Sequence, residues 1–189
     1  SLVNFLYSRS KINTINKINI YQILLFALIL RLVAFIIMPN IEFPDLTTYT
    51  NAGLQLFSTG QINEDNVMPL HPIFVNLLQN SFMIKLANIL LSTASVWLVY
   101  QLALVTVKEK LYATLSALGA SVYPHFIFYS ITGLTETLYV FLLLLAFLLL
   151  YKKQFIWAMI VITISILHRP VIDLLAPILI FIFSFYVHK

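Results

Sequence analysis

Long apolar runs, separated by short polar stretches, dominate this chain. Four runs, at 20–38, 82–107, 111–129 and 133–151, come close to or exceed the roughly 20 residues that a helix needs to cross a bilayer. A last apolar stretch, 154–187, divides at His168-Arg169-Pro170, because proline disfavours helix for the residue before it. The pattern predicts an all-α, polytopic membrane bundle of about six transmembrane helices, of which the fifth is short.

The composition supports the same class of protein. Of the 189 residues 61% are hydrophobic, with 11 Lys and Arg, 7 Asp and Glu, and no cysteine. A soluble domain is typically about 45–50% apolar and about 25% charged, so this composition excludes one. The absence of cysteine excludes disulfides, thiolate metal sites and a cysteine nucleophile. The basic residues form small clusters between the apolar runs, so we expect no nucleic-acid partner.

The distribution of cations predicts the topology. With a cytoplasmic N-terminus, eight of the eleven basic residues fall on the inner side: Arg9, Lys11, Lys17, Lys108, Lys110, Lys152, Lys153 and Lys189. We therefore predict a single transmembrane domain over 1–189, with both termini cytoplasmic. Residues 1–19 form a polar lead-in, and 20–38 reads as a retained signal anchor, since no small-residue cleavage site follows it. The other three cations are Arg31, Lys85 and Arg169, within spans or at their outer ends.

The segment 39–81 is the one long loop and is predicted to be extracytoplasmic. It carries four of the seven acids and neither Lys nor Arg. Asp45 is placed to N-cap a helix that ends near Gly60. A second short helix is expected to begin at Pro72. The predicted apolar faces are Leu46, Tyr49, Ala52, Gly53 and Leu56 for the first, and Ile73, Phe74, Leu77 and Leu78 for the second. Two such amphipathic helices can lie on the membrane and roof a cavity between the spans.

Several short motifs occur in an order typical of one family. They are Leu30-Arg31-Leu32, Pro44-Asp45 followed by Tyr49 and Ala52, Pro69-Leu70-His71-Pro72, Lys85, Tyr123-Pro124-His125, Thr135-Glu136, and Arg169-Pro170. Together they resemble the N-terminal part of the polytopic glycosyltransferases of the GT-C type, which include the protein O-mannosyltransferases and the aminoarabinose transferases. Members of that family are usually much longer, so this chain is expected to be a fragment of a longer protein.

The resemblance implies transfer of a sugar from a polyprenyl-phosphate donor to an acceptor hydroxyl at the outer face of a bacterial inner membrane. Such a reaction needs a base for the acceptor proton and cations for the departing phosphate. Asp45 is the predicted base, with helix capping as the alternative explanation for it. The predicted partners are the lipid-linked donor, membrane lipids, and an acceptor that is a glycan, a lipid or a protein.

Two cations are candidates for binding the carrier phosphate. Arg169 can hold phosphate oxygens bidentately, and Lys85 lies at the outer end of a span. The alternative for both is that the long side chain reaches lipid headgroups. His71, Glu136 and Tyr49 complete the predicted substrate-binding set.

Arg31 lies within the first predicted span, where an unpaired charge costs about 2.5–3.5 kcal/mol. We predict an ion pair with Glu136, although Glu136 can equally favour the positive end of its own helix. Glu42 and Asp45 form a weak candidate for a metal site. The family's mannosyltransferase-like members are thought to work without a metal, so no cofactor is expected.

Two other functions fit the composition. One is a transporter or flippase component, and the other is a non-catalytic membrane fragment or partner subunit. The concentration of acids in an outer loop favours the enzyme, provided that Asp45 and Arg169 open into one cavity.

Overall fold

The computed structural model describes residues 18–38, 43–63, 67–170 and 181. Every regular element in these ranges is an α-helix, which confirms the all-α prediction. The helices are α2 (Ile20–Ile37), α3 (Pro44–Thr59), α4 (Leu70–Leu78), α5 (Ser81–Val107), α6 (Lys110–Val122), α7 (Pro124–Ser130), α8 (Glu136–Tyr151) and α9 (Phe155–His168). The predicted sixth span, most of the lead-in, and Glu42 lie outside the described residues.

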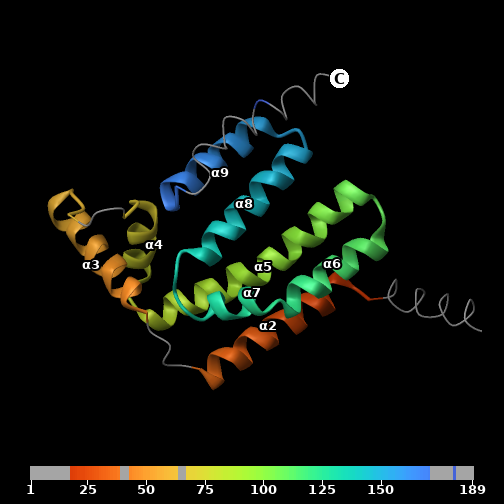
Figure 1. The fold of residues 1–189 in the computed structure, drawn as a ribbon, viewed down its shortest axis with the longest axis horizontal. Coiled ribbons are helices and arrows are strands. Elements are labelled where there is room, and N and C mark those ends of the chain that lie inside the picture. The colour runs from red at the N-terminus through yellow and green to blue at the C-terminus, as the bar shows by residue number, and fades with distance from the viewer. Residues whose placement is uncertain (1–17, 39–42, 64–66, 171–180, 182–189) are drawn as a thin grey trace, which may run out of the picture.

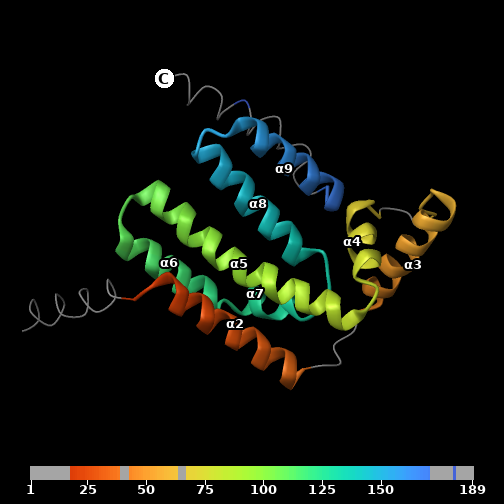
Figure 2. The ribbon, with the colours of Figure 1, turned by 180° about the vertical axis from the view of Figure 1, so that it is seen from behind.

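Helix α5 runs through the middle of the bundle (Figure 1, Figure 2). It packs against α2 and α6 on one side and against α8 on the other, and α9 packs on α8. Helices α3 and α4 lie at one end of the bundle, and the α5–α6 and α8–α9 turns lie at the opposite end. Those two turns carry Lys108, Lys110, Lys152 and Lys153, so these cations gather at the end remote from α3 and α4.

Two of the described helices are long and apolar enough to cross a membrane. They are α2 with 18 residues and α5 with 27. Helices α8 and α9 are also apolar but have only 16 and 14 residues. At the helical rise of 1.5 Å per residue they measure about 24 and 21 Å, short of a hydrocarbon core of roughly 30 Å. The number of spans and their orientation therefore stay predictions.

The predicted continuous helix at 111–129 is wrong, because the chain breaks between α6 and α7. Tyr123 has φ −63° and ψ 118°, the extended conformation that a following proline favours. Pro124 also lacks the N–H that would continue the helix. Helix α8 likewise begins at Glu136 rather than at the predicted Gly133, since Gly133 has a φ of 75° and turns the chain.

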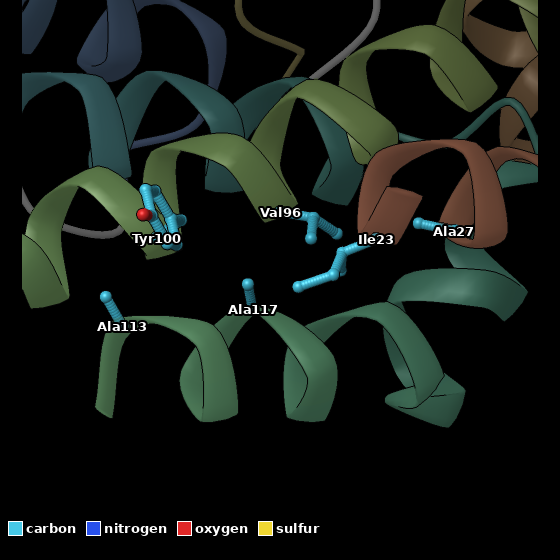
Figure 3. Close-up of a cluster of buried hydrophobic side chains, with 6 residues drawn as sticks. All are labelled: Ile23, Ala27, Val96, Tyr100, Ala113 and Ala117. Carbon is cyan, nitrogen blue, oxygen red and sulfur yellow. The ribbon is translucent and has the colours of Figure 1, made fainter. Parts of the chain in front are cut away.

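Small residues allow the helices to approach closely. One cluster of buried side chains joins α2, α5 and α6 (Figure 3), and its members are Ile23, Ala27, Val96, Tyr100, Ala113 and Ala117. A second cluster joins α8 and α9 through Ala146, Leu150, Ala158 and Ile162. Alanine at such contacts lets helix backbones come together, as is common between membrane helices. A third cluster, Leu46, Val75 and Ile84, fixes α3 and α4 to the start of α5.

Arg31 is completely buried and has different partners from those predicted. Its Nε donates to Ser92 Oγ at 2.8 Å, and its Nη1 donates to the carbonyl oxygens of Ala27 at 2.9 Å and Ser121 at 3.3 Å. The predicted ion pair with Glu136 is wrong, since Glu136 pairs with Arg169. Ser121 lies in the last turn of α6, where the helix presents carbonyl oxygens and partial negative charge. The end of the broken helix therefore compensates the guanidinium in place of a carboxylate.

Candidate active site

Asp45 lies in the first turn of α3 but does not cap it. The N-cap is Phe43, and Pro44 occupies the first helical position, which its fixed φ favours. No side chain makes a capping hydrogen bond at this end of the helix, so the predicted capping role is wrong. The Asp45 side chain is exposed. The carboxylate is therefore available for contact with a ligand.

Helices α3 and α4 meet at Gly53. A Cβ at this position would lie 2.7 Å from the carbonyl oxygen of Pro72, so only glycine permits the observed approach. Helix α3 ends at Gly60 as predicted, with φ at 74°.

The predicted apolar face of α4 is confirmed only in part, since Phe74 and Leu78 pack against the cluster of Leu46, Val75 and Ile84. The buried residues are His71, Pro72 and Val75, whereas Leu77 is 69% exposed. Helix α4 begins at Leu70 rather than at Pro72, and it turns the face that carries His71 toward α3 and α9. Apolar periodicity missed this orientation because the side chain at its centre is a histidine.

An ion pair joins the start of α8 to the end of α9. Arg169 Nη1 donates to Glu136 Oε1 at 2.7 Å and to Thr135 Oγ1 at 3.4 Å. The two charged side chains are 38% and 26% exposed, so the pair is accessible from solvent. Both hydrogen bonds use Nη1, which leaves Nη2 and Nε of the guanidinium as donors for a ligand.

The site is a cavity of about 310 Å³ formed between the segment from α3 to α4 and the ends of α8 and α9. Its lining residues are Asp45, Tyr49, Met68, His71, Leu134, Thr135, Glu136, His168, Arg169 and Pro170. The prediction that Asp45 and Arg169 open into one cavity is thus confirmed. Of the other predicted site residues, Tyr49, His71 and Glu136 also line it, and their proposed roles stay predictions.

Two histidines form part of the cavity wall. His71 is 1% exposed and His168 is 2% exposed, and their ring centroids are 4.9 Å apart. Tyr49 packs edge-on against His71, with a centroid distance of 4.5 Å. His168 Nε2 lies 2.9 Å from the carbonyl oxygen of Thr135. The sequence did not single out His168 or Thr135 as site residues, because only the fold brings them beside α4.

The surroundings shift the pKa of two of these side chains. Burial and, to a smaller extent, the neighbouring His168 lower the pKa of His71 to about 3, although the backbone of Gly133 acts in the opposite direction. His71 is therefore neutral at physiological pH. Burial also raises the pKa of Tyr49, assisted by the negative charges of Asp45 and Glu136. The Tyr49 hydroxyl therefore remains protonated.

One predicted ligand residue, Lys85, is not part of the cavity wall. Lys85 is 3% exposed on α5 and does not line the cavity that contains Arg169, so its contact with the carrier phosphate stays a prediction. Glu42 lies outside the described residues, and the weak metal site with Asp45 stays a prediction. Among the residues that the structure describes, no three His, Cys, Asp or Glu side chains are grouped so that they could hold a metal ion.

A comparison with models of known protein families, with characterised proteins and with solved structures found no match to this chain.

Proposed function

We propose that this chain belongs to a membrane glycosyltransferase that uses a polyprenyl-phosphate sugar as donor. The acceptor hydroxyl attacks the anomeric carbon, and the bond between that carbon and the phosphate oxygen breaks. The polyprenyl phosphate leaves with the electron pair, and Asp45 takes the proton of the acceptor. The observation that carries this proposal is the common cavity of Asp45 and Arg169.

The composition of the cavity wall supports this chemistry. A carboxylate that is exposed and makes no capping hydrogen bond can serve as a general base. The guanidinium of Arg169 has donors left for a phosphate oxygen, and bidentate recognition of phosphate is typical of arginine. Glu136 holds that guanidinium at 2.7 Å, so the cation is positioned before a ligand arrives.

The place of the cavity in the bundle supports a lipid-linked substrate. It lies where α3 and α4 meet the start of α8 and the end of α9, at one end of the bundle (Figure 1). Large apolar side chains on the surface of the bundle include Ile36 at 74%, Ile156 at 75% and Trp157 at 62% exposure. Exposed apolar surface of this kind is typical of contact with lipid. A polyprenyl chain can therefore lie along the helices in the bilayer while its phosphate reaches Arg169.

The test is a transfer assay on membranes that contain the complete gene product. Radiolabelled mannose, glucose or aminoarabinose on a polyprenyl-phosphate carrier is the donor, and label incorporated into membrane acceptors is measured. Asp45→Asn is expected to lower the rate by about 10²–10⁴-fold, the usual contribution of a general base. Glu109→Gln, an exposed acid between α5 and α6 at the opposite end of the bundle, is the matched control and should transfer normally.

Arg169→Met in the same assay should raise the KM for the donor. Unchanged transfer by Asp45→Asn at equal protein abundance would remove Asp45 from the mechanism. If the wild-type protein transfers sugar from none of the three donors, the proposed function is refuted.

A further inference from the structure

The polar atoms of the two histidines in the cavity wall are not all satisfied by the protein. His168 Nε2 lies 2.9 Å from the carbonyl oxygen of Thr135, and a carbonyl oxygen only accepts. Nε2 therefore carries the hydrogen, and Nδ1 of the neutral ring is an acceptor. This buried Nδ1 has no hydrogen-bond partner among the described residues.

His71 offers two further ring nitrogens. Neither Nδ1 nor Nε2 makes a hydrogen bond of regular geometry in the part of the chain that is described, although the ring is 1% exposed. The neutral ring has one donor and one acceptor. The backbone of Gly133 lies near the His71 ring, but no hydrogen bond of regular geometry joins them. Buried polar groups in proteins are nearly always hydrogen-bonded, so the unpartnered His168 Nδ1 and the incompletely satisfied His71 ring at one wall of a cavity point to a bound ligand. Tyr49 and Phe74 contact the His71 ring and hold its orientation.

We propose that His71 and His168 form a subsite for the hydroxyl groups of a neutral sugar ring. The inference rests on the proposed function, because it takes the cavity to be the donor or acceptor site of that enzyme. A hydroxyl both donates and accepts. It can therefore donate to His168 Nδ1, and it can pair with either the donor or the acceptor nitrogen of the His71 ring. Phosphate oxygens at neutral pH mainly accept, so a phosphate is repelled by His168 Nδ1 and belongs at Arg169 instead.

The size and polarity of the cavity agree with a single sugar unit. Its volume of about 310 Å³ is at the lower end of the roughly 300–1,000 Å³ of small-molecule sites. The histidines occupy one part of the wall, and Asp45, Glu136 and Arg169 supply its charges. A monosaccharide can therefore contact the histidines while its reacting group lies near the charged residues.

The test is saturation-transfer NMR on the full chain in lipid nanodiscs. The probes are the methyl glycosides of mannose, glucose and galactose, with inorganic phosphate in a separate arm. The informative variant is His168→Gln, because a glutamine amide can still donate to the Thr135 carbonyl but has no acceptor at the position of Nδ1. His168→Asn has the opposite property, with an oxygen near the position of Nδ1. His125→Gln is the matched control, since His125 is exposed and does not line the cavity.

At least one glycoside is expected to bind the wild-type protein in a saturable manner. His168→Gln should weaken this binding about tenfold or more, the usual effect of removing a buried hydrogen-bond partner. His168→Asn should keep most of the affinity, His125→Gln all of it, and phosphate binding should not change in His168→Gln. Circular dichroism verifies that each variant keeps its helix content.

Three outcomes would overturn the subsite. They are no saturable binding of any glycoside, equal binding by the wild type and His168→Gln, and equal losses in the Gln and Asn variants, which would indicate packing alone. These failures are separable from failure of the proposed function. Normal sugar binding with unimpaired transfer by Asp45→Asn would refute the assigned base and leave the subsite intact. Loss of transfer in Asp45→Asn with glycoside binding unaffected by His168→Gln would refute only the subsite.

Discussion

Replacing Gly53 by alanine should weaken the contact that forms one wall of the cavity. The new methyl group would lie 2.7 Å from the Pro72 carbonyl oxygen and 3.0 Å from Asn76 Cβ, whereas ordinary contacts begin at 3.4 Å. The first neighbour is a backbone atom, so α3 and α4 must separate by about 0.7 Å rather than let a side chain rotate. Overpacking of this kind costs about 1–3 kcal/mol, offset in part by the roughly 0.5–1 kcal/mol that alanine gains over glycine in a helix. We expect the free energy of unfolding to fall by up to about 2.5 kcal/mol.

Gly119→Ala is the matched control, because it makes the same change within α6, where a Cβ meets nothing within 4 Å. It should stabilise the protein by about 0.5–1 kcal/mol through helix propensity alone. Both variants can be unfolded with SDS in mixed micelles and followed by circular dichroism. Opposite signs for the two substitutions support the close approach of α3 and α4. Equal stabilisation by both would refute it, and with it the geometry that places His71 beside Tyr49.

Two further predictions concern buried polar groups. His71 is held neutral with a pKa of about 3, whereas the unfolded chain has the ordinary value of 6.5, so between these pH values only the unfolded state gains a proton. The free energy of unfolding should therefore fall by up to about 1.4 kcal/mol per pH unit as the pH drops below 6.5. His71→Phe should reduce this dependence on pH. An unchanged dependence in the variant would contradict the conclusion that His71 is buried in its neutral form. Ser92→Ala should destabilise the bundle by about 1–3 kcal/mol, because Ser92 Oγ accepts from Arg31 and donates to the Phe126 carbonyl. Ser95→Ala, which loses only a bond to the Leu91 carbonyl within its own helix, should change the stability by less than about 0.5 kcal/mol, and equal effects of the two serines would count against the Arg31 network.

Local signals in the sequence predicted much of the site. The run of Pro44 and Asp45 before an amphipathic segment indicated α3, and Gly60 indicated its end, because proline and glycine act on the backbone beside them. The proline after Arg169 likewise marked the end of α9. The backbone preferences of proline and glycine depend on a few neighbouring residues, so they act in the same way whatever the tertiary structure.

Predictions about partners failed more often. Arg31 was expected to need a carboxylate, yet its Nε and Nη1 donate to Ser92 and to carbonyl oxygens, because a break at Pro124 presents a helix end beside it. The binding of phosphate by Lys85 stays a prediction, but the rotation of α5 buries this side chain outside the cavity that contains Arg169. Local sequence patterns do not specify how α5 is rotated about its axis or which helix end lies beside Arg31.

The sequence by itself determined that the described chain is helical and apolar, where most of its helices end, and that Asp45 and Arg169 occur at helix ends. Only the tertiary structure decided that these ends meet around one cavity, that Glu136 pairs with Arg169, and that His168 joins His71. The reason is physical: backbone preferences act over one turn of helix, whereas pairing of side chains depends on how helices rotate and approach. That packing is set by contacts between residues far apart in the chain, such as the approach of Gly53 to Pro72.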